Sequence, residues 1–362
     1  MNLRLTGIIM MVLAGCSHPE ARRDLGAELN EALRDSYADT RSLDVIFATN
    51  REPAPEGATN CSSEAFTVRM GTEVHYGSCQ INTPKKHAVG AIEVATDARA
   101  DTHEFFRPLG YTALDLEGVR RAIQDRHPES VLVFVHGFNV KFQDAVMRAA
   151  QIAYDLKFQG PVVLFSWPAG AEGTLNNALV NRTYHANREA AVNSVPALAA
   201  FLRFLSTLGV PVHLLVHSMG HQVVVPARAL ASADPIVRRG FIRELVMNAP
   251  DIATADFLKA MSQIRELVHR TTVYCSFNDR AIAASQTYNS GARLGACERV
   301  EGVDMINVSG LDAPTLGLGH GYYSARPVLT DVFQILLGID AERRLFMRKS
   351  EPNSVESFFL RP

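Results

Sequence analysis

Three residues of the types used in acyl transfer follow one another along the chain as Ser218, Asp279 and His320. Each lies in a short polar or glycine-containing stretch that comes after an apolar run. In acyl transfer a serine hydroxyl attacks the carbonyl carbon, a histidine takes its proton, and an acid fixes the tautomer of that histidine. The order predicts such a catalytic triad, although Asp279 alone is typical of a helix N-cap and His320 alone of a surface loop.

The serine lies in the stretch Val216-His217-Ser218-Met219-Gly220, between a very apolar run and an amphipathic one. A serine on a tight strand-to-helix turn has an exposed hydroxyl, and small residues on either side of it let strand and helix approach closely. Gly220 meets this requirement, whereas Val216 replaces the expected glycine. The stretch predicts a nucleophile, and a helix N-cap is the alternative role of Ser218.

A second turn, Val135-His136-Gly137-Phe138-Asn139, follows an earlier apolar run. Acyl transfer needs backbone N–H groups that point at the oxygen on which negative charge develops, each worth roughly 10² to 10³ in rate. We expect the N–H groups of Phe138 and Met219 to form this oxyanion hole. An ordinary strand-ending turn is the alternative, and His136 itself is expected to be structural.

Other polar and aromatic residues also follow apolar runs. Trp167, the only tryptophan, and Tyr322 are expected to line the substrate pocket, with core packing as the alternative for each. Asp251 is a reserve candidate for the acid of the triad, but a helix N-cap is its favoured role.

His213, His217 and His221 recur every four residues, which raises the question of a metal site. The three cross from an expected strand into an expected helix, so they do not share one helical face, and the sequence has no H-E-x-x-H motif. We therefore expect neither a metal nor another cofactor.

Apolar runs and amphipathic stretches alternate from about residue 102 onward. The runs expected to be strands cover residues 131–135, 162–165, 212–216, 244–247, 271–274 and 305–308. Stretches such as 142–156 and 188–205 have apolar residues at three- and four-residue spacing, as amphipathic helices do. This alternation predicts an α/β fold with a mainly parallel, doubly wound sheet and helices on both faces. Loops at the carboxyl ends of such strands meet at one edge, where ligands bind.

The remaining chain is divided by composition. Residues 41–100 contain strand-like stretches at 45–49, 66–68 and 74–76, and are expected to form a strand-rich extension packed beside the catalytic domain of residues 101–343. Residues 344–362 are expected to be a loose tail, and residues 16–40 a polar, helix-prone tether.

The first residues predict export. Arg4 precedes a short apolar run, and residues 13–16, Leu-Ala-Gly-Cys, resemble the lipobox of bacterial lipoproteins, whose cysteine is acylated as the signal is removed. We expect residues 1–15 to be the signal peptide and Cys16 to carry the lipid, in the cell envelope and at the outer membrane facing the periplasm. An ordinary secretory signal with a chance cysteine is the alternative.

Four cysteines remain after Cys16. Pairing of Cys61 with Cys79 and of Cys275 with Cys297 would close two short loops, although four cysteines allow three connectivities and free buried thiols are a further possibility. Disulfides would agree with an exported protein.

Composition limits the partners. The chain of 362 residues has 36 Lys and Arg against 38 Asp and Glu, and no local cluster of basic residues. Nucleic acid is therefore not expected as a partner. A small-molecule or lipid ester, and a membrane reached through the N-terminal lipid, are expected instead; the oligomeric state is left open.

Five short motifs together carry a resemblance to a known family. They are His-Gly-Phe-Asn at 136–139, Phe-Ser-Trp-Pro at 165–168, His-Ser-Met-Gly at 217–220, Asn-Asp-Arg at 278–280 and Gly-His-x-Tyr at 319–322. With Ala-Thr-Asn-Arg at 48–51, this ordered set over residues 43–340 resembles a bacterial esterase- and lipase-like family of α/β-hydrolases. The resemblance implies the α/β-hydrolase fold and a triad of Ser218, Asp279 and His320.

The sequence thus predicts a serine hydrolase that cleaves carboxylic esters through an acyl-enzyme at the cell envelope. An acyltransferase or thioesterase would use the same triad. A non-catalytic envelope lipoprotein that uses the fold for binding is the alternative from another class, and Val216 is the residue that favours it.

Overall fold

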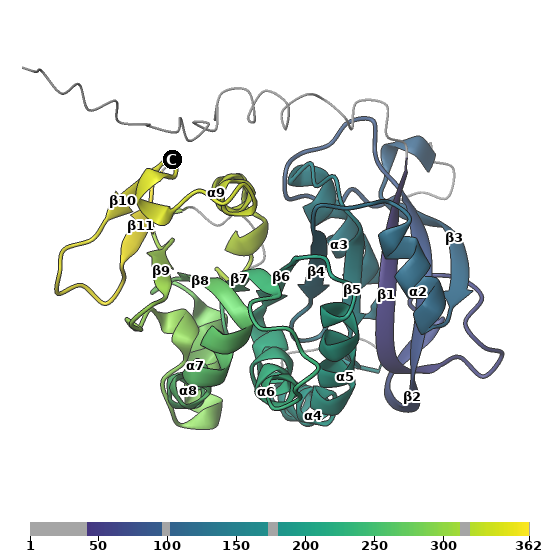
Figure 1. The fold of residues 1–362 in the computed structure, drawn as a ribbon, viewed down its shortest axis with the longest axis horizontal. Helices are drawn as coiled ribbons and strands as arrows, with labels where there is room; N and C mark the ends of the chain where they lie inside the picture. The colour runs from purple at the N-terminus through teal and green to yellow at the C-terminus, as the bar shows by residue number, and fades with distance from the viewer. Residues whose placement is uncertain (1–41, 96–101, 173–179, 312–318, 362) are drawn as a thin grey trace, which may run out of the picture.

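The computed structural model describes residues 42–95, 102–172, 180–311 and 319–361, which form one mixed sheet with helices on both faces (Figure 1). Along the sheet the strands follow the order β10 (Met347–Lys349), β11 (Phe358–Leu360), β9 (Asp304–Asn307), β8 (Val268–Cys275), β7 (Ile242–Asn248), β6 (Val212–His217), β4 (Val131–Val135), β5 (Val162–Ser166), β1 (Ser42–Pro53), β2 (Phe66–Asn82) and β3 (Arg107–Leu114).

The centre of the sheet is parallel. Strands β1, β5, β4, β6, β7, β8, β9 and β11 pair in parallel, whereas β2, β3 and β10 pair antiparallel at the two edges. All five residues of β4 and of β5 are buried, because helices cover both faces. The predicted α/β class with a mainly parallel sheet is confirmed.

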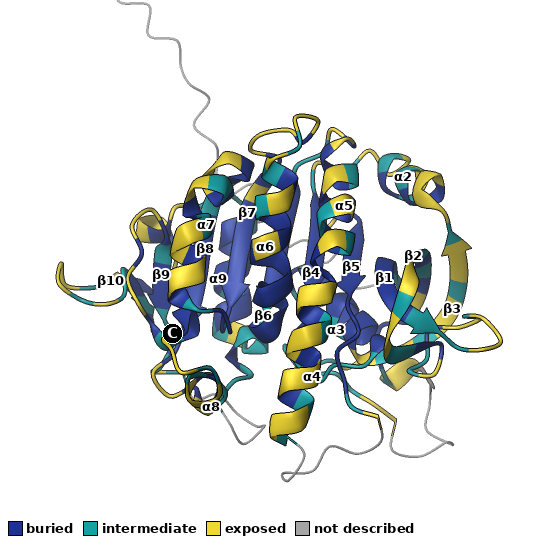
Figure 2. Ribbon diagram, turned by 90° about the horizontal axis from the view of Figure 1, so that it is seen from below, coloured by how far each residue is buried: buried dark blue, intermediate teal, exposed yellow. Residues whose placement is uncertain are grey.

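Two layers of helices enclose the sheet. Helices α3 (Phe142–Asp155) and α9 (Arg326–Leu336) contribute to one hydrophobic core. Helices α2 (Leu116–Gln124), α5 (Val195–Ser206), α6 (His221–Ser232) and α7 (Thr254–Leu267) contribute to the other. Figure 2 shows the buried strands behind this second layer, with α4 (Val180–Asn193) and α8 (Arg280–Asn289) near it.

The N-terminal extension is rich in strands, and these strands join the edge of the main sheet instead of packing beside it. Strand β1 pairs in parallel with β5 over Val45–Thr49, so this segment continues the main sheet. The stretches expected as two strands at 66–68 and 74–76 are parts of the single strand β2. A disulfide joins Cys61 to Cys79 across this region.

The expectation of a loose tail after Arg344 is also wrong. Strand β11 adds to β9, and the Ser357 N–H donates to the Met305 carbonyl at 2.9 Å. Phe358 and Leu360 are buried in the core of α3 and α9. A strand of three residues is too short to show a period, so the chain pattern did not reveal it.

The expected signal peptide, the lipidated Cys16 and the tether lie outside the described residues. Within the ranges that the structure describes, no helix combines the length and apolar character needed to cross a bilayer.

Candidate active site

Ser218 lies at the sharp turn between β6 and α6. Its φ is +53°, and Ser218–Gly220 form a 3-10 turn that leads into the helix. Such a left-handed conformation is strained for a residue with a side chain, and here it is held by hydrogen bonds to the Ser218 carbonyl from the Asp251 N–H at 3.2 Å and from His221 Nδ1 at 2.7 Å. Val216 packs in the core below the turn, so its side chain does not prevent the strained geometry.

The structure brings Ser218, Asp279 and His320 together in one hydrogen-bonded chain. His320 Nδ1 lies 2.7 Å from Asp279 Oδ2, and His320 Nε2 lies 2.7 Å from Ser218 Oγ. Because an ionised carboxylate only accepts hydrogen bonds, Nδ1 carries the proton and Nε2 accepts from the Ser218 hydroxyl. This is the geometry in which a serine loses its proton to a histidine.

Asp279 combines the two roles that its sequence position left open. One carboxylate oxygen, Oδ2, binds His320, while Oδ1 accepts from the N–H groups of Ala281 and Ile282, each at 3.0 Å. The carboxylate therefore caps α8 and is fixed in orientation by that helix. Its side chain is fully buried, whereas that of His320 is 19% exposed.

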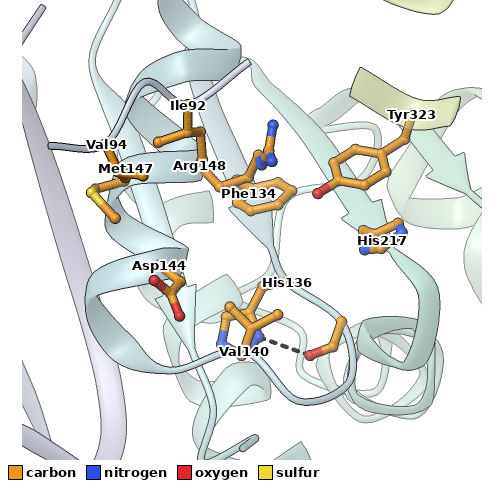
Figure 3. Close-up of a pocket in the computed structure, with 11 residues that line it drawn as sticks. Ile92, Val94, Phe134, His136, Val140, Asp144, Met147, Arg148, His217 and Tyr323 are labelled. Carbon is orange, nitrogen blue, oxygen red and sulfur yellow. Dashed lines mark hydrogen bonds between the residues drawn. The ribbon is translucent and has the colours of Figure 1, made fainter. Parts of the chain in front are cut away.

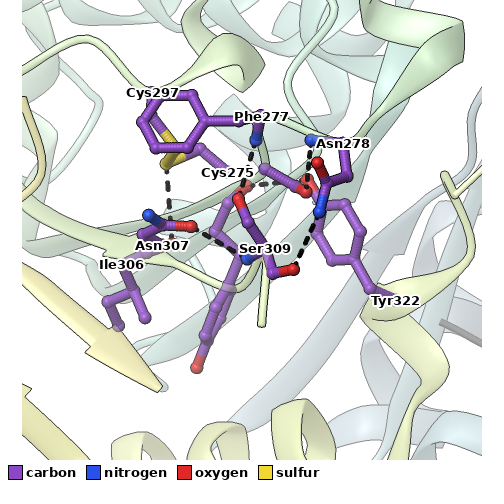
Figure 4. Close-up of a disulfide and its surroundings, with 10 residues drawn as sticks. Cys275, Phe277, Asn278, Cys297, Ile306, Asn307, Ser309 and Tyr322 are labelled. Carbon is purple, nitrogen blue, oxygen red and sulfur yellow. Dashed lines mark hydrogen bonds between the residues drawn. A yellow bond between two sulfur atoms is a disulfide. The ribbon is translucent and has the colours of Figure 1, made fainter. Parts of the chain in front are cut away.

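A disulfide anchors the loop before Asp279 (Figure 4). Cys275 ends β8 and is bonded to Cys297, with a Cα–Cα distance of 5.1 Å. In the same loop, Phe277 N–H donates to Ser309 Oγ at 2.8 Å and Asn278 Nδ2 donates to the Ser309 carbonyl at 2.9 Å. These contacts tie the loop after β8 to the loop after β9.

Two glycines let the turn after β4 approach the serine turn. A Cβ on Gly137 would lie 2.8 Å from Ser218 Cβ, and one on Gly220 would lie 2.5 Å from the His136 carbonyl oxygen. Side chains at either position would push the turns apart. The turn after β4, which continues to Phe138, therefore packs directly against the turn that carries Ser218 and Met219.

Trp167 does not line the substrate pocket, which corrects an expectation. Its side chain is fully buried, stacks on the His136 ring at 5.3 Å between centroids, and donates from Nε1 to the His136 carbonyl at 2.9 Å. The tryptophan therefore packs beneath the turn after β4 and supports it from the core.

Tyr322 is likewise a core residue and not a pocket residue. It is 1% exposed, and its hydroxyl donates to the Tyr274 carbonyl at 3.2 Å. The neighbouring Tyr323 lies at the surface of a pocket instead, with its ring stacked on His217 at 3.8 Å between centroids.

That pocket adjoins the turn after β4 and has a volume of about 280 Å³ (Figure 3). Gly137 and His217, which both flank Ser218, form part of its wall. Its other walls come from α3, from the segment before residue 95 and from Tyr323. The lining residues are Ile92, Val94, Phe134, His136, Gly137, Val140, Asp144, Met147, Arg148, His217 and Tyr323.

Arg51 supports the same turn from β1 and is completely buried. Its guanidinium donates to the carbonyls of Val140 at 2.7 Å and Ala169 at 2.9 Å, and to Ser166 Oγ at 2.9 Å. Burial lowers the pKa of Arg51 to about 9. Burial, together with the charge of Arg51, lowers the pKa of His136 to about 3, so that imidazole is neutral.

Asp251, the reserve acid, serves another network. Its carboxylate accepts from Tyr184 Oη at 2.9 Å and from the Ser285 hydroxyl, and lies 3.5 Å from Arg293 Nε. His320 hydrogen-bonds Asp279 instead.

The three regularly spaced histidines have separate surroundings. His213 forms a T-shaped ring pair with Phe158, His217 stacks on Tyr323, and His221 hydrogen-bonds the Ser218 carbonyl. Burial is the main cause that lowers the pKa of each of them, to about 3 for His221. In the part of the chain that the structure describes, no three His, Cys, Asp or Glu side chains gather as a metal site would require.

The family comparison agrees with this geometry. A family model described as "alpha/beta hydrolase of unknown function" matches residues 115–339, which include all three members of the hydrogen-bonded chain. The protein belongs to this α/β-hydrolase family. The match covers the strands from β4 to β9 and most of the helices around them.

Solved structures similar to this α/β-hydrolase are distant. A cold-adapted esterase from an Arctic intertidal metagenomic library shares 10% identity, with 82% of this chain and 94% of that chain covered and a TM-score of 0.38. An esterase of Pyrococcus furiosus shares 12%, with 59% and 84% covered and a TM-score of 0.31. One from Pyrobaculum calidifontis shares 12%, with 74% and 75% covered and a TM-score of 0.28. No curated protein matches.

Sequence reasoning missed the residues that support the α/β-hydrolase site from outside the motif turns. Arg51 belongs to the Ala-Thr-Asn-Arg stretch that carries the resemblance, but its sequence neighbours do not reveal the carbonyls that it binds. Arg148 and Met147 lie within an ordinary amphipathic helix. No signal in the chain pattern could have placed them at the pocket.

Proposed function

We propose that this α/β-hydrolase cleaves carboxylic esters through an acyl-enzyme on Ser218. The observation that carries the proposal is the pair of 2.7 Å contacts of His320, with Ser218 Oγ on one side and Asp279 Oδ2 on the other. Together they supply a nucleophile, a general base and a group that stabilises the protonated imidazole.

The reaction balances with these groups alone. Ser218 Oγ attacks the ester carbonyl carbon while its proton passes to His320 Nε2. The bond from the carbonyl carbon to the alcohol oxygen then breaks, and the same proton goes to the departing alcohol. A water molecule next attacks the acyl carbon and gives a proton to His320, which returns it to Ser218 Oγ as the carboxylic acid leaves.

The oxyanion of each tetrahedral intermediate needs fixed donors. We assign this role to the N–H groups of Phe138 and Met219, because Gly137 and Gly220 bring their turns against each other beside Ser218. Loss of one such donor costs roughly 10² to 10³ in rate. Acyl transfer to another acceptor would use the same groups, and the acceptor admitted decides between the two reactions.

A fluorophosphonate probe tests the nucleophile without a guess at the substrate. The full-length protein in detergent is treated with the probe, and the adduct is located by mass spectrometry. We expect labelling at Ser218 that is lost in Ser218→Ala and strongly slowed in His320→Ala. Well-folded protein that is not labelled would favour the non-catalytic binding protein, and a label elsewhere would mean that another residue is the nucleophile.

We also propose that the protein is anchored to the cell envelope by acylation of Cys16. The Leu-Ala-Gly-Cys stretch supports this, as do the two disulfides, because such bonds persist in oxidising compartments. Detergent phase partitioning of the protein expressed in a bacterium, compared with Cys16→Ser, tests it. We expect the unchanged protein in the detergent phase and the variant retained as an uncleaved precursor; identical processing and partitioning would disprove acylation.

A further inference from the structure

The pocket beside the serine turn lies on a definite side of the proposed reaction. In Figure 3, Tyr323 and His217 stand opposite Ile92, Val94 and Met147 across this pocket. The His217 ring stacks on Tyr323 at 3.8 Å and lies 5.0 Å from the His320 ring, between centroids. One wall of the pocket is therefore built against the histidine that handles the proton.

This position selects the alcohol part of the ester. The departing alcohol oxygen must reach His320 Nε2 to receive its proton, so the alcohol leaves on the histidine side of Ser218. The acyl carbon stays bonded to Ser218 Oγ while its oxygen points at the N–H groups of the two turns. The wall made by His217 and Tyr323 lies on this side, next to His320, which favours the alcohol as the group that enters the pocket.

The lining favours an uncharged, apolar occupant. Ile92, Val140 and Met147 contribute apolar surface. The two charged side chains are opposite in sign. Arg148 lies over the Tyr323 ring at 5.6 Å and donates to the Gly90 carbonyl, and Asp144 lies one helical turn before it. Burial raises the pKa of Asp144, while the positive charges of Lys141, Arg51 and Arg148 oppose this shift. No net charge of one sign selects a charged ligand.

The size of the pocket limits the occupant. Pockets that enclose drug-sized ligands span roughly 300–1,000 Å³, and this one has about 280 Å³. Met147 is 5% exposed and closes the pocket on the α3 side. A short chain fits, whereas a long one meets this side chain.

We propose that this pocket binds the alcohol part of the ester and restricts it to a short, neutral, apolar group, with Met147 setting the length limit. The proposal rests on the proposed ester hydrolysis at Ser218. It names the substrate class as esters of short alcohols and leaves the acyl chain outside this pocket.

Two ester series test it, with acid release followed by titration. The first holds the acyl group constant, from methyl to octyl acetate; the second holds the alcohol constant, from ethyl acetate to ethyl octanoate. We expect kcat/KM of the unchanged protein to fall at the longer alcohols. In Met147→Ala the ratio of kcat/KM for hexyl acetate to that for ethyl acetate should rise by about tenfold or more, because binding a few additional methylenes in an apolar pocket changes kcat/KM by that factor.

A narrowing variant covers the case in which Met147→Ala folds poorly. Ile92 is half-buried on the same side of the pocket as Met147, so Ile92→Phe should fold and lower the ratio of kcat/KM for butyl acetate to that for methyl acetate by about tenfold. Met261→Ala, at a similarly buried methionine in α7 away from the pocket, is the matched control that should leave both series unshifted.

The outcomes separate the two proposals. If Ser218 reacts with the fluorophosphonate but the pocket variants shift the acyl series, or shift neither series, the pocket assignment is overturned and the hydrolase stands. If Ser218 does not react in well-folded protein, the proposed function itself fails.

Discussion

Two halves of the site are held in place by different means. The serine half consists of the turns after β4, β5 and β6, and the acid–histidine half consists of the loops after β8 and β9. In the serine half, the buried guanidinium of Arg51 binds carbonyls of the turns after β4 and β5. In the acid–histidine half, a disulfide and the helix cap made by Asp279 fix the loops.

The difference follows from how tightly each half must pack. Gly137 lies so close to Ser218 that a Cβ added at Gly137 would lie 2.8 Å from the Ser218 Cβ. A buried donor such as Arg51 can hydrogen-bond the carbonyls of such compact turns from below, so the surface that faces Ser218 stays free. The acid–histidine half is more open, since Phe277 is 57% exposed. A covalent bond keeps its strength next to water, whereas hydrogen bonds there compete with solvent.

The largest effect on catalysis is expected at Asp279. Substitutions there can separate the two roles of its carboxylate, which are to bind His320 and to cap α8. Asn caps a helix about as well as Asp but cannot stabilise the imidazolium. In Asp279→Asn we expect the free energy of unfolding to change by less than about 0.5 kcal/mol, while ester hydrolysis falls by about 10⁴. Denaturant unfolding and kcat measure the two quantities.

Asp279→Ala sharpens this test, because it removes the cap as well. It should be about 1 kcal/mol less stable than Asp279→Asn and equally inactive. Equal stability of the two variants would show that the cap contributes nothing, and residual activity in Asp279→Asn above a hundredth of the original rate would mean that another acid serves His320.

The next effect in size is expected at Arg51. Arg51→Met leaves the Val140 and Ala169 carbonyls without their buried donor, each worth about 1–3 kcal/mol, although removal of a desolvated charge offsets part of this. We expect a net loss of about 2 kcal/mol in the free energy of unfolding and a fall of about 10² in kcat as the turn after β4 shifts. Circular dichroism in urea and ester kinetics measure them.

The exposed pair of Arg126 with Asp44 supplies a matched control for Arg51. Both of its side chains are more than 40% exposed, so Arg126→Met should cost less than about 1 kcal/mol and leave kcat unchanged. A kcat of Arg51→Met equal to that of Arg126→Met would show that the buried guanidinium does not position the serine half.

The sequence predicts the parts of the fold that repeat. Continuous apolar runs identify β4 to β9, because strands buried on both faces need apolar residues at every position. Strand β3 and the short β10 and β11 were not predicted, because an exposed edge strand and three-residue strands lack a period. These three strands form only by pairing with other strands of the folded sheet, and that pairing cannot be read from their own residues.

For the site, the sequence predicts the residues in the motif turns but not their surroundings. Ser218, Asp279 and His320 each follow a strand and are found together, whereas the aromatic residues were assigned to the wrong environment. A strand-end position gives the edge of the sheet, but not whether a ring such as Trp167 turns toward solvent or core. Arg51 binds mainly backbone carbonyls, which every residue has, so the sequence does not identify its partners.

The two disulfides offer a matched pair of cross-links for the third test. Their sequence separations are 18 and 22, so replacing either pair by serines should cost a similar amount, about 3 kcal/mol. Only the Cys275–Cys297 bond adjoins Asp279. Its removal should therefore also lower kcat by about tenfold, since small displacements of catalytic groups are costly, while loss of Cys61–Cys79 leaves kcat unchanged. Equal kcat values would remove the disulfide from the account of the acid–histidine half.

The smallest effect concerns His87, which fastens the segment carrying Ile92 to α3. His87 Nε2 lies 2.7 Å from Asp155 and Nδ1 lies 3.0 Å from Glu93. Burial alone would lower the pKa of His87, but the bonds and charges of Asp155 and Glu93 outweigh it, and its pKa is raised. The charged form therefore stabilises the fold fully below the unfolded pKa of about 6.5, and this contribution disappears as pH rises through the higher folded pKa.

His87→Gln isolates this contribution from that of the buried neutral histidines, which the variant retains. The difference in the free energy of unfolding between the unchanged protein and His87→Gln should be largest near pH 6 and shrink toward pH 9, by no more than about 1.4 kcal/mol per pH unit. Urea unfolding at several pH values measures it. A difference in the free energy of unfolding that grows with pH would contradict the raised pKa of His87. A difference that stays constant with pH would mean that His87 holds the pocket wall as a neutral ring. The pocket wall would then be fixed independently of charge, as the acid–histidine half is by its disulfide.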